Sequence, residues 1–140
     1  MFSNLFYGDA MLIQKQEVQK VSNAMMNILR EDEIELINNF YDAIKAKDID
    51  KIDDLFKDVV AELDTNFKTE EEMMEQNAYH DMQMHKSDHD LIRKKLEKFH
   101  KRWEVLKGPK EVQGFLEKDF KKWYTQHVSK WDAQTAPHVG

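Results

Sequence analysis

Four segments of the chain place apolar residues at alternating steps of three and four, the spacing that keeps side chains on one face of an α-helix. They span residues 22–47, 49–76, 83–106 and 110–130. The breaks between them are short, and the last contains Gly108 and Pro109, which end one helix and begin the next. Because short connections make successive helices antiparallel, we predict an all-α fold, an antiparallel up-down-up-down four-helix bundle.

The composition agrees with this fold. Only four glycines and two prolines interrupt 140 residues that are rich in Lys, Glu, Leu, Met and Gln, which are good helix formers. A chain of this length is expected to form a single domain over residues 1–140. Residues 1–21 have a weaker pattern, so we expect them to form an N-terminal arm or an extension of the first helix.

Composition also limits the partners. The absence of cysteine means that any metal would be held by His, Asp or Glu. The formal net charge of −6 argues against nucleic acid as a partner. No apolar run approaches the roughly 20 residues of a membrane span, and no signal peptide is recognisable. We therefore expect a cytoplasmic protein without a membrane partner, and the sequence identifies no protein partner.

Each apolar stripe has polar residues at one end only. Those ends are the start of the first and third helices and the end of the second and fourth, which lie at one level of an up-down-up-down bundle. The polar residues in question are Arg30, Asn66, Glu70, His85, His89 and His127. The sequence therefore predicts that these six side chains meet inside one end of the core.

Buried polar groups without partners cost about 1 to 3 kcal/mol each, so something must satisfy this cluster. Imidazoles at i and i+4, a third from a facing helix and a carboxylate suit a divalent metal, although an HxxxH pair alone is also typical of helix surfaces. Asp132 follows His127 by five residues and points about 140° away on a regular helix, so it joins only if the helix widens or ends there. No nucleophile motif or phosphate-binding loop occurs, so a hydrolase or nucleotide-binding function has no support, and the residues leave open whether the protein is an enzyme.

The motifs resemble those of the hemerythrins, most closely the bacterial ones. "NFKTEE" (66–71) is similar to the family's His-Phe-x-x-Glu-Glu, "HKSDH" (85–89) to its HxxxH, and "WYTQHVSKWD" (123–132) to its W-x-x-x-H-x-x-x-x-D. The resemblance implies a four-helix bundle around a di-iron centre that binds oxygen reversibly. It implies that His85, His89 and His127 hold one iron, and that Glu70 and Asp132 bridge the two.

The second iron is where the sequence departs from the family. The two histidines that hold it correspond to Arg30 and Asn66. Arginine does not deprotonate in proteins and asparagine is a weak ligand, so a normal second site is not expected. We predict that the Arg30 guanidinium faces the missing iron's place and bonds to Glu70 and Asp132; an arginine that extends to solvent is the alternative.

These residues favour a non-haem iron protein with one ion rather than two, although zinc remains open as the metal. Reversible oxygen storage takes two electrons, one from each iron of the family's centre. An altered mononuclear site therefore favours oxygen or redox sensing, with O2 or another small diatomic such as nitric oxide as the ligand. The alternatives are a di-iron oxygen carrier and an interaction or signalling bundle in which a metal is only structural or is absent.

Overall fold

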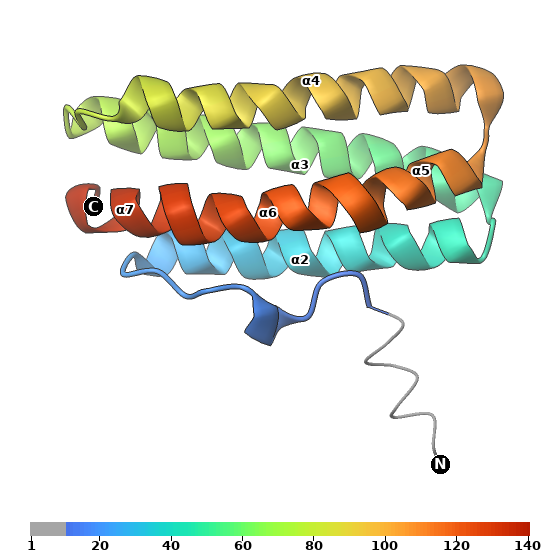
Figure 1. The fold of residues 1–140 in the computed structure, drawn as a ribbon, viewed down its shortest axis with the longest axis horizontal. Coiled ribbons are helices and arrows are strands. Elements are labelled where there is room, and N and C mark those ends of the chain that lie inside the picture. The colour runs from blue at the N-terminus through green and yellow to red at the C-terminus, as the bar shows by residue number, and fades with distance from the viewer. Residues whose placement is uncertain (1–10) are drawn as a thin grey trace, which may run out of the picture.

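The computed structural model describes residues 11–140, and in that range it contains four long helical runs (Figure 1). The first three runs are α2 (Ala24–Lys45), α3 (Ile49–Gln76) and α4 (Met82–Leu106). The fourth consists of α5 (Pro109–Phe115), η2 (Leu116–Phe120), α6 (Lys121–His127), η3 (Val128–Asp132), α7 (Ala133–Thr135) and η4 (Ala136–His138). The runs alternate in direction, which confirms the predicted bundle and extends the last helix beyond residue 130.

Local sequence signals set the ends of the helices. Asn23 caps α2 by accepting a hydrogen bond from the Met26 amide (3.0 Å), and Asp48 caps α3 through the Lys51 amide (3.3 Å). Lys107 closes α4 in the left-handed region (φ 49°), and Pro109 then occupies the first turn of α5. These compact connections bring the start of α4 beside the end of α3, at the same level as the start of α2.

The fourth run is not a uniform α-helix, because it contains two π-helical turns. In η2 the Lys121 amide donates to the Leu116 carbonyl, and in η3 the Ala133 amide donates to the Val128 carbonyl. Each bond spans five residues instead of four, so each turn accommodates one extra residue. The second of these turns ends at Asp132, and it provides the widening that this residue needs in order to share a face with His127.

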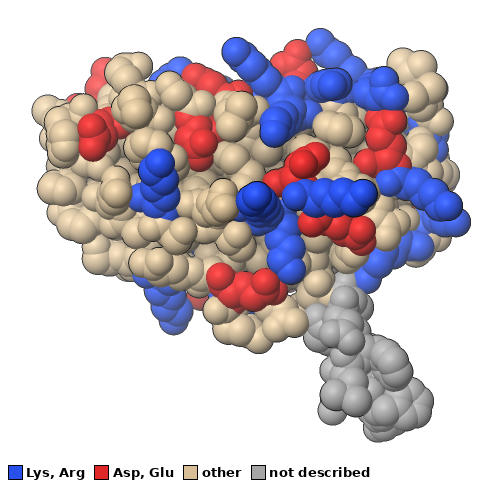
Figure 2. Space-filling view, viewed as in Figure 1, with Lys and Arg blue, Asp and Glu red and all other residues tan. Residues whose placement is uncertain are grey.

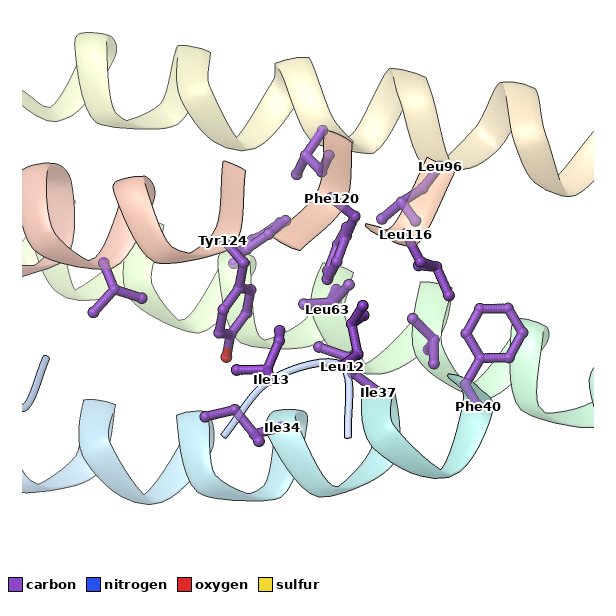
Figure 3. Close-up of a cluster of buried hydrophobic side chains, with 14 of the residues drawn as sticks. Leu12, Ile13, Ile34, Ile37, Phe40, Leu63, Leu96, Leu116, Phe120 and Tyr124 are labelled. Atoms are coloured by element: carbon purple, nitrogen blue, oxygen red, sulfur yellow. The ribbon is translucent and has the colours of Figure 1, made fainter. Parts of the chain in front are cut away.

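The core follows the predicted stripes. Apolar side chains from all four runs and from the N-terminal arm interlock along the bundle axis (Figure 3). The labelled members are Leu12, Ile13, Ile34, Ile37, Phe40, Leu63, Leu96, Leu116, Phe120 and Tyr124. Three apolar residues at the helical spacing of the stripes are not fully buried: Leu106 lies 59% exposed at the end of α4, and Phe99 and Trp123 are half-buried. Tyr124, next to Trp123, is buried instead.

Residues 11–23 form an arm that lies along α2 rather than extending it (Figure 1). Two asparagines of α2 hold it: the Asn38 amide bonds both the N–H and the C=O of Ile13, and the Asn27 amide does the same for Val21. A short 3-10 turn, η1 (Lys15–Glu17), lies between these contacts. Of the arm predicted for residues 1–21, the part over residues 11–21 is therefore present, and residues 1–10 lie outside the described part of the chain.

Opposite charges on neighbouring helices pair across the surface. Arg93 of α4 contacts Asp64 and Glu71 of α3, and Lys107 contacts Asp53. Figure 2 accordingly shows acidic side chains interspersed among the basic ones. On this face the basic side chains gather toward the end of the bundle where α4 ends and α5 begins. None of the helices described in residues 11–140 combines the length and apolarity that crossing a membrane requires.

Candidate metal centre

Five buried side chains meet inside the end of the bundle where α2 begins. His85 and His89 come from the first turns of α4, Glu70 from α3, His127 from the end of α6 and Asp132 from the end of η3. Each offers a donor atom, and all five atoms lie within 4.8 Å of one another. The structure thus brings together all five residues that were predicted as ligands, from three of the four helical runs.

The distances between these donors match those around a shared cation. Asp132 Oδ1 lies 3.1 Å from Nε2 of both His85 and His127, and Glu70 Oε1 lies 3.1 Å from Nε2 of His89. A metal about 2.1 Å from each donor holds adjacent donors about 3 Å apart. The five atoms therefore fit a single coordination sphere, whose centre we refer to as the metal position.

The outward nitrogen of each imidazole already has a partner. His89 Nδ1 lies 2.8 Å from Glu71 Oε2, and His127 Nδ1 lies 2.7 Å from Asp88 Oδ2. His85 Nδ1 lies 2.7 Å from the Thr135 hydroxyl. Because an ionised carboxylate can only accept, Nδ1 of the first two rings carries a proton, and Nε2 is the nitrogen that faces the cluster and is available to a metal.

Aromatic rings fix the planes of two of these imidazoles. Phe67 stacks on His89 with ring centroids 4.1 Å apart and planes 9° apart. Trp123 stacks on His127 at 4.6 Å and 20°. Both aromatics belong to the motifs that carry the sequence resemblance, so the same stretches supply the ligands and the packing that orients them.

Several inward-facing atoms of the cluster have no hydrogen-bond partner. Among the described residues, the buried atoms Glu70 Oε1, Asp132 Oδ1 and His89 Nε2 are all in this state. When both carboxyl groups are ionised and His89 is neutral, these three atoms are all acceptors and cannot satisfy one another, whereas a cation satisfies all three. The residues present therefore fit a metal ion chemically as well as geometrically.

The electrostatics of the cluster are those of a site that must gain positive charge. Burial and the Asp132 charge raise the pKa of Glu70 to about 8. Burial alone would lower the pKa of His127, but Asp132, Asp88 and Glu70 raise it to about 10. Burial would raise the pKa of Asp132, yet His127, His85 and Arg30 hold it far below its usual range. In the absence of a cation, protons held by Glu70 and His127 offset the negative charge of the cluster at neutral pH.

Comparison with known proteins identifies the family to which the chain belongs. The sequence profile described as "Hemerythrin HHE cation binding domain" matches residues 23–139. The chain belongs to the hemerythrin family. It is 39% identical over 130 residues to the bacteriohemerythrin of Aquifex aeolicus (strain VF5). The matched region covers 93% of this chain and 99% of that protein. A crystal structure of a mutant protein shares its fold, with a TM-score of 0.75 and 20% identity over 83% of this chain and 87% of the other.

Arg30 and Asn66, the two positions where the sequence departs from the family motifs, form a polar network beside the cluster. Arg30 is 5% exposed, and its Nη2 donates to Asp132 Oδ2 at 2.5 Å. The predicted inward orientation of Arg30 and its bond to Asp132 are therefore correct. No hydrogen bond to Glu70 accompanies it in the described part of the chain, and Arg30 acts on Glu70 through its charge.

Asn66 is also buried, and it binds a carboxylate that the sequence analysis did not single out. Its Nδ2 donates to Glu33 Oε2 at 2.7 Å, and the Tyr124 hydroxyl donates to Glu33 Oε1 at 2.7 Å. Burial and the nearby Glu70 charge raise the pKa of Glu33 to about 7 despite these two donors. Two other helical runs thus contact Glu33 of α2, through the two side chains that donate to it.

Sequence reasoning missed the residues that act on the ligands from outside. Glu33 follows Arg30 by three residues on the buried stripe of α2, and this position was the available signal. Glu71 and Asp88 lie next to ligands in sequence but were not singled out, while Thr135 lies beyond the predicted end of the last helix. Their roles depend on how neighbouring helices are rotated, which periodicity does not specify.

Proposed function

We propose that this hemerythrin binds one non-haem iron ion through His85, His89, His127, Glu70 and Asp132, and that it senses or binds oxygen or a redox signal there. The observation that carries the proposal is the charge of the buried residues. Three carboxylates (Glu33, Glu70 and Asp132) and the single guanidinium of Arg30 are buried, leaving two negative charges when the histidines are neutral. One divalent cation neutralises them, and a second would leave an uncompensated double positive charge.

The positive charge of Arg30 supports a mononuclear site in particular. Its guanidinium binds Asp132, the carboxylate that bridges two irons according to the family resemblance. Arg30 Nη2 lies 2.5 Å from Asp132 Oδ2, so a cation could bind this oxygen only by displacing the guanidinium. Asn66, at the second expected histidine position, donates its amide N–H2 to Glu33, and this nitrogen offers a cation no lone pair.

When bound, iron would supply a one-electron redox centre with room for an exogenous ligand. Glu71, Asp88 and Thr135 would keep the three imidazole ligands in a fixed orientation around the ion through their contacts with the Nδ1 atoms. A centre that provides one electron suits reporting the presence of oxygen, nitric oxide or an oxidant better than storing oxygen by a two-electron reaction. Zinc fits the same donors but would lack the redox step.

The second candidate is a di-iron oxygen carrier, which is favoured by the 39% identity to a bacteriohemerythrin. A di-iron carrier requires the Arg30 side chain to move away from Asp132. It also requires Glu33 to serve as a new metal ligand. Metal analysis separates the two: one iron per chain supports the mononuclear site, and two irons with the visible absorption of a bridged centre support the carrier.

Substitution tests the ligand assignment itself. His85→Ala should abolish metal binding, whereas His80→Ala, which removes an exposed histidine near the start of the same helix, should leave it unchanged. An unaltered metal content in His85→Ala would refute the assignment. Restoring both family histidines at positions 30 and 66 should raise the iron content toward two per chain if Arg30 and Asn66 are what exclude the second ion.

A further inference from the structure

The outer face of α4 carries apolar side chains that the core does not use. The buried residues of this helix, among them His85 and His89, lie on its inner face. On the opposite face Met84, Leu91 and Val105 are 60%, 48% and 81% exposed. Single exposed apolar residues are common on protein surfaces, so the spacing of these three decides whether they form a binding surface.

The three residues belong to a series with one position every seven residues, and Lys98 occupies the remaining position. Seven residues turn an α-helix through about 700°, which is roughly 20° short of two full turns. The four positions therefore form one nearly straight line about 32 Å long. We call it the α4 outer line, which comprises Met84, Leu91, Lys98 and Val105. A line with this period is typical of a helix that packs along the length of a second helix.

Basic side chains border the α4 outer line on both sides. At about 100° per residue, Lys95 and Arg102 lie on one side of it. Lys94 and Lys101 lie on the other side, and Figure 2 shows basic side chains gathered over this half of α4. Within the described residues Lys94 and Lys95 have no ion-pair partner. Lys101 and Arg102 make ion pairs only at the surface, where such pairs contribute little and are readily exchanged.

This arrangement suits a helix of another protein better than a membrane surface. Lys98 interrupts the apolar residues, and neighbouring positions of the line are about 10 Å apart, so there is no continuous apolar face to insert into lipid. The formal net charge of −6 also means that an anionic bilayer would repel much of the molecule. A partner helix contacts only the line, and it can place an aliphatic side chain beside each apolar residue and a carboxylate beside each lysine.

We propose that the α4 outer line is a docking surface for an amphipathic helix of another protein, with aliphatic residues at heptad spacing and acidic residues on both sides of them. Charge complementarity with Lys94, Lys95 and their basic neighbours selects an acidic partner, and the apolar residues of the line supply buried contact area. The partner helix lies on the outside of the helix whose inner face carries His85 and His89. The inference goes beyond the proposed function and does not require a bound metal.

The test uses a synthetic helical peptide as the probe, with leucines at heptad spacing and glutamates on both sides of them. Binding to the full chain is followed by the fluorescence anisotropy of a dye on the peptide. Leu91→Ser should weaken binding about tenfold because it removes an apolar contact, and Lys95→Glu should weaken it about tenfold through repulsion. Both side chains are exposed, so the variants should fold as the wild type does, which circular dichroism verifies.

Matched controls and two further measurements separate this surface from general attraction of charges. Ile28→Ser and Lys57→Glu change an exposed isoleucine of α2 and an exposed lysine of α3, and should alter the affinity by less than about twofold. A peptide with lysines in place of the glutamates should bind about tenfold more weakly or less well still. Added salt should weaken peptide binding more in the wild type than in Lys95→Glu.

Three outcomes would overturn the inference. The first is absence of binding between the glutamate peptide and the wild-type chain, and the second is equal affinity of the wild type and both α4 variants. The third is binding of the wild type, but not of Leu91→Ser, to vesicles of equimolar phosphatidylcholine and phosphatidylglycerol without binding to the peptide, which would identify a membrane surface instead. Iron content enters none of these measurements, so the proposed metal site stands or falls separately.

Discussion

Replacement of Glu33 by glutamine tests the buried charge most directly. The pKa of Glu33 is raised from 4.5 to about 7 in the folded, metal-free chain, chiefly by burial and then by Glu70. A raised carboxyl pKa means that the folded state binds the proton more tightly than the unfolded state. The contribution of Glu33 to the stability of the fold is therefore fully present below about pH 4.5 and is lost as the pH rises through 7.

The size of the effect follows from the two pKa values. Between pH 4.5 and pH 8.5 the ionisation of Glu33 costs about 3 kcal/mol of unfolding free energy. Glu33→Gln removes this cost while it keeps the shape of the side chain, and Asn66 can rotate its amide so that its oxygen accepts from the new N–H2 group. The variant should therefore gain about 3 kcal/mol over the wild type on going from pH 4.5 to pH 8.5, or about 10 °C in melting temperature.

Chemical denaturation of the chelator-treated protein at the two pH values measures this gain. Glu35→Gln is the matched control, since it removes an exposed carboxyl two residues away on the same helix and should change stability by less than about 0.5 kcal/mol. Loading a divalent metal should shrink the gain, because the ion offsets the Glu70 charge that helps to raise the pKa of Glu33. An equal change in stability at both pH values would refute the reasoning.

Three further predictions concern the centre and the arm. Thr135→Val removes the hydroxyl that orients one imidazole and should weaken metal binding about tenfold in competition with a chelator; unchanged affinity would contradict that role. Because His127 and Glu70 have pKa values of about 10 and 8 without metal, binding of a divalent ion at pH 7 should release about two protons. Calorimetry in buffers of different ionisation enthalpy measures this release, and a value of zero would exclude it. Asn38→Ala removes both amide bonds to the arm and should cost about 1 to 3 kcal/mol without changing metal content, as denaturation and metal analysis would reveal.

The sequence was sufficient for the fold and for the inner residues of the candidate site. Four stripes of helical period fix which faces are buried, and their polar ends indicate where the side chains meet. Asp132 shows the limit of that reasoning, since five α-helical residues would turn it away from His127 and only the family resemblance supported it. The structure resolves the conflict with the π turn η3.

The supporting contacts could not be predicted in the same way. Glu71, Asp88 and Thr135 reach the imidazoles sideways, from positions that a helical stripe assigns to its edge or to solvent. The Glu33 network needs Asn66 and Tyr124 from two other helical runs at one depth in the bundle. Such contacts depend on how each helix is rotated about its axis and shifted along it. Hydrophobic periodicity does not specify either closely enough to predict a single contact.

The π turn between His127 and Asp132 also sets a condition for transferring this centre to a designed protein. An ideal straight helix brings the fourth following residue, not the fifth, back to nearly the same direction. A designer who copied the five side chains onto four ideal helices would therefore have to write the aspartate one residue earlier. Copied with its native spacing, the carboxylate would swing toward the outside of the bundle and leave a four-donor set.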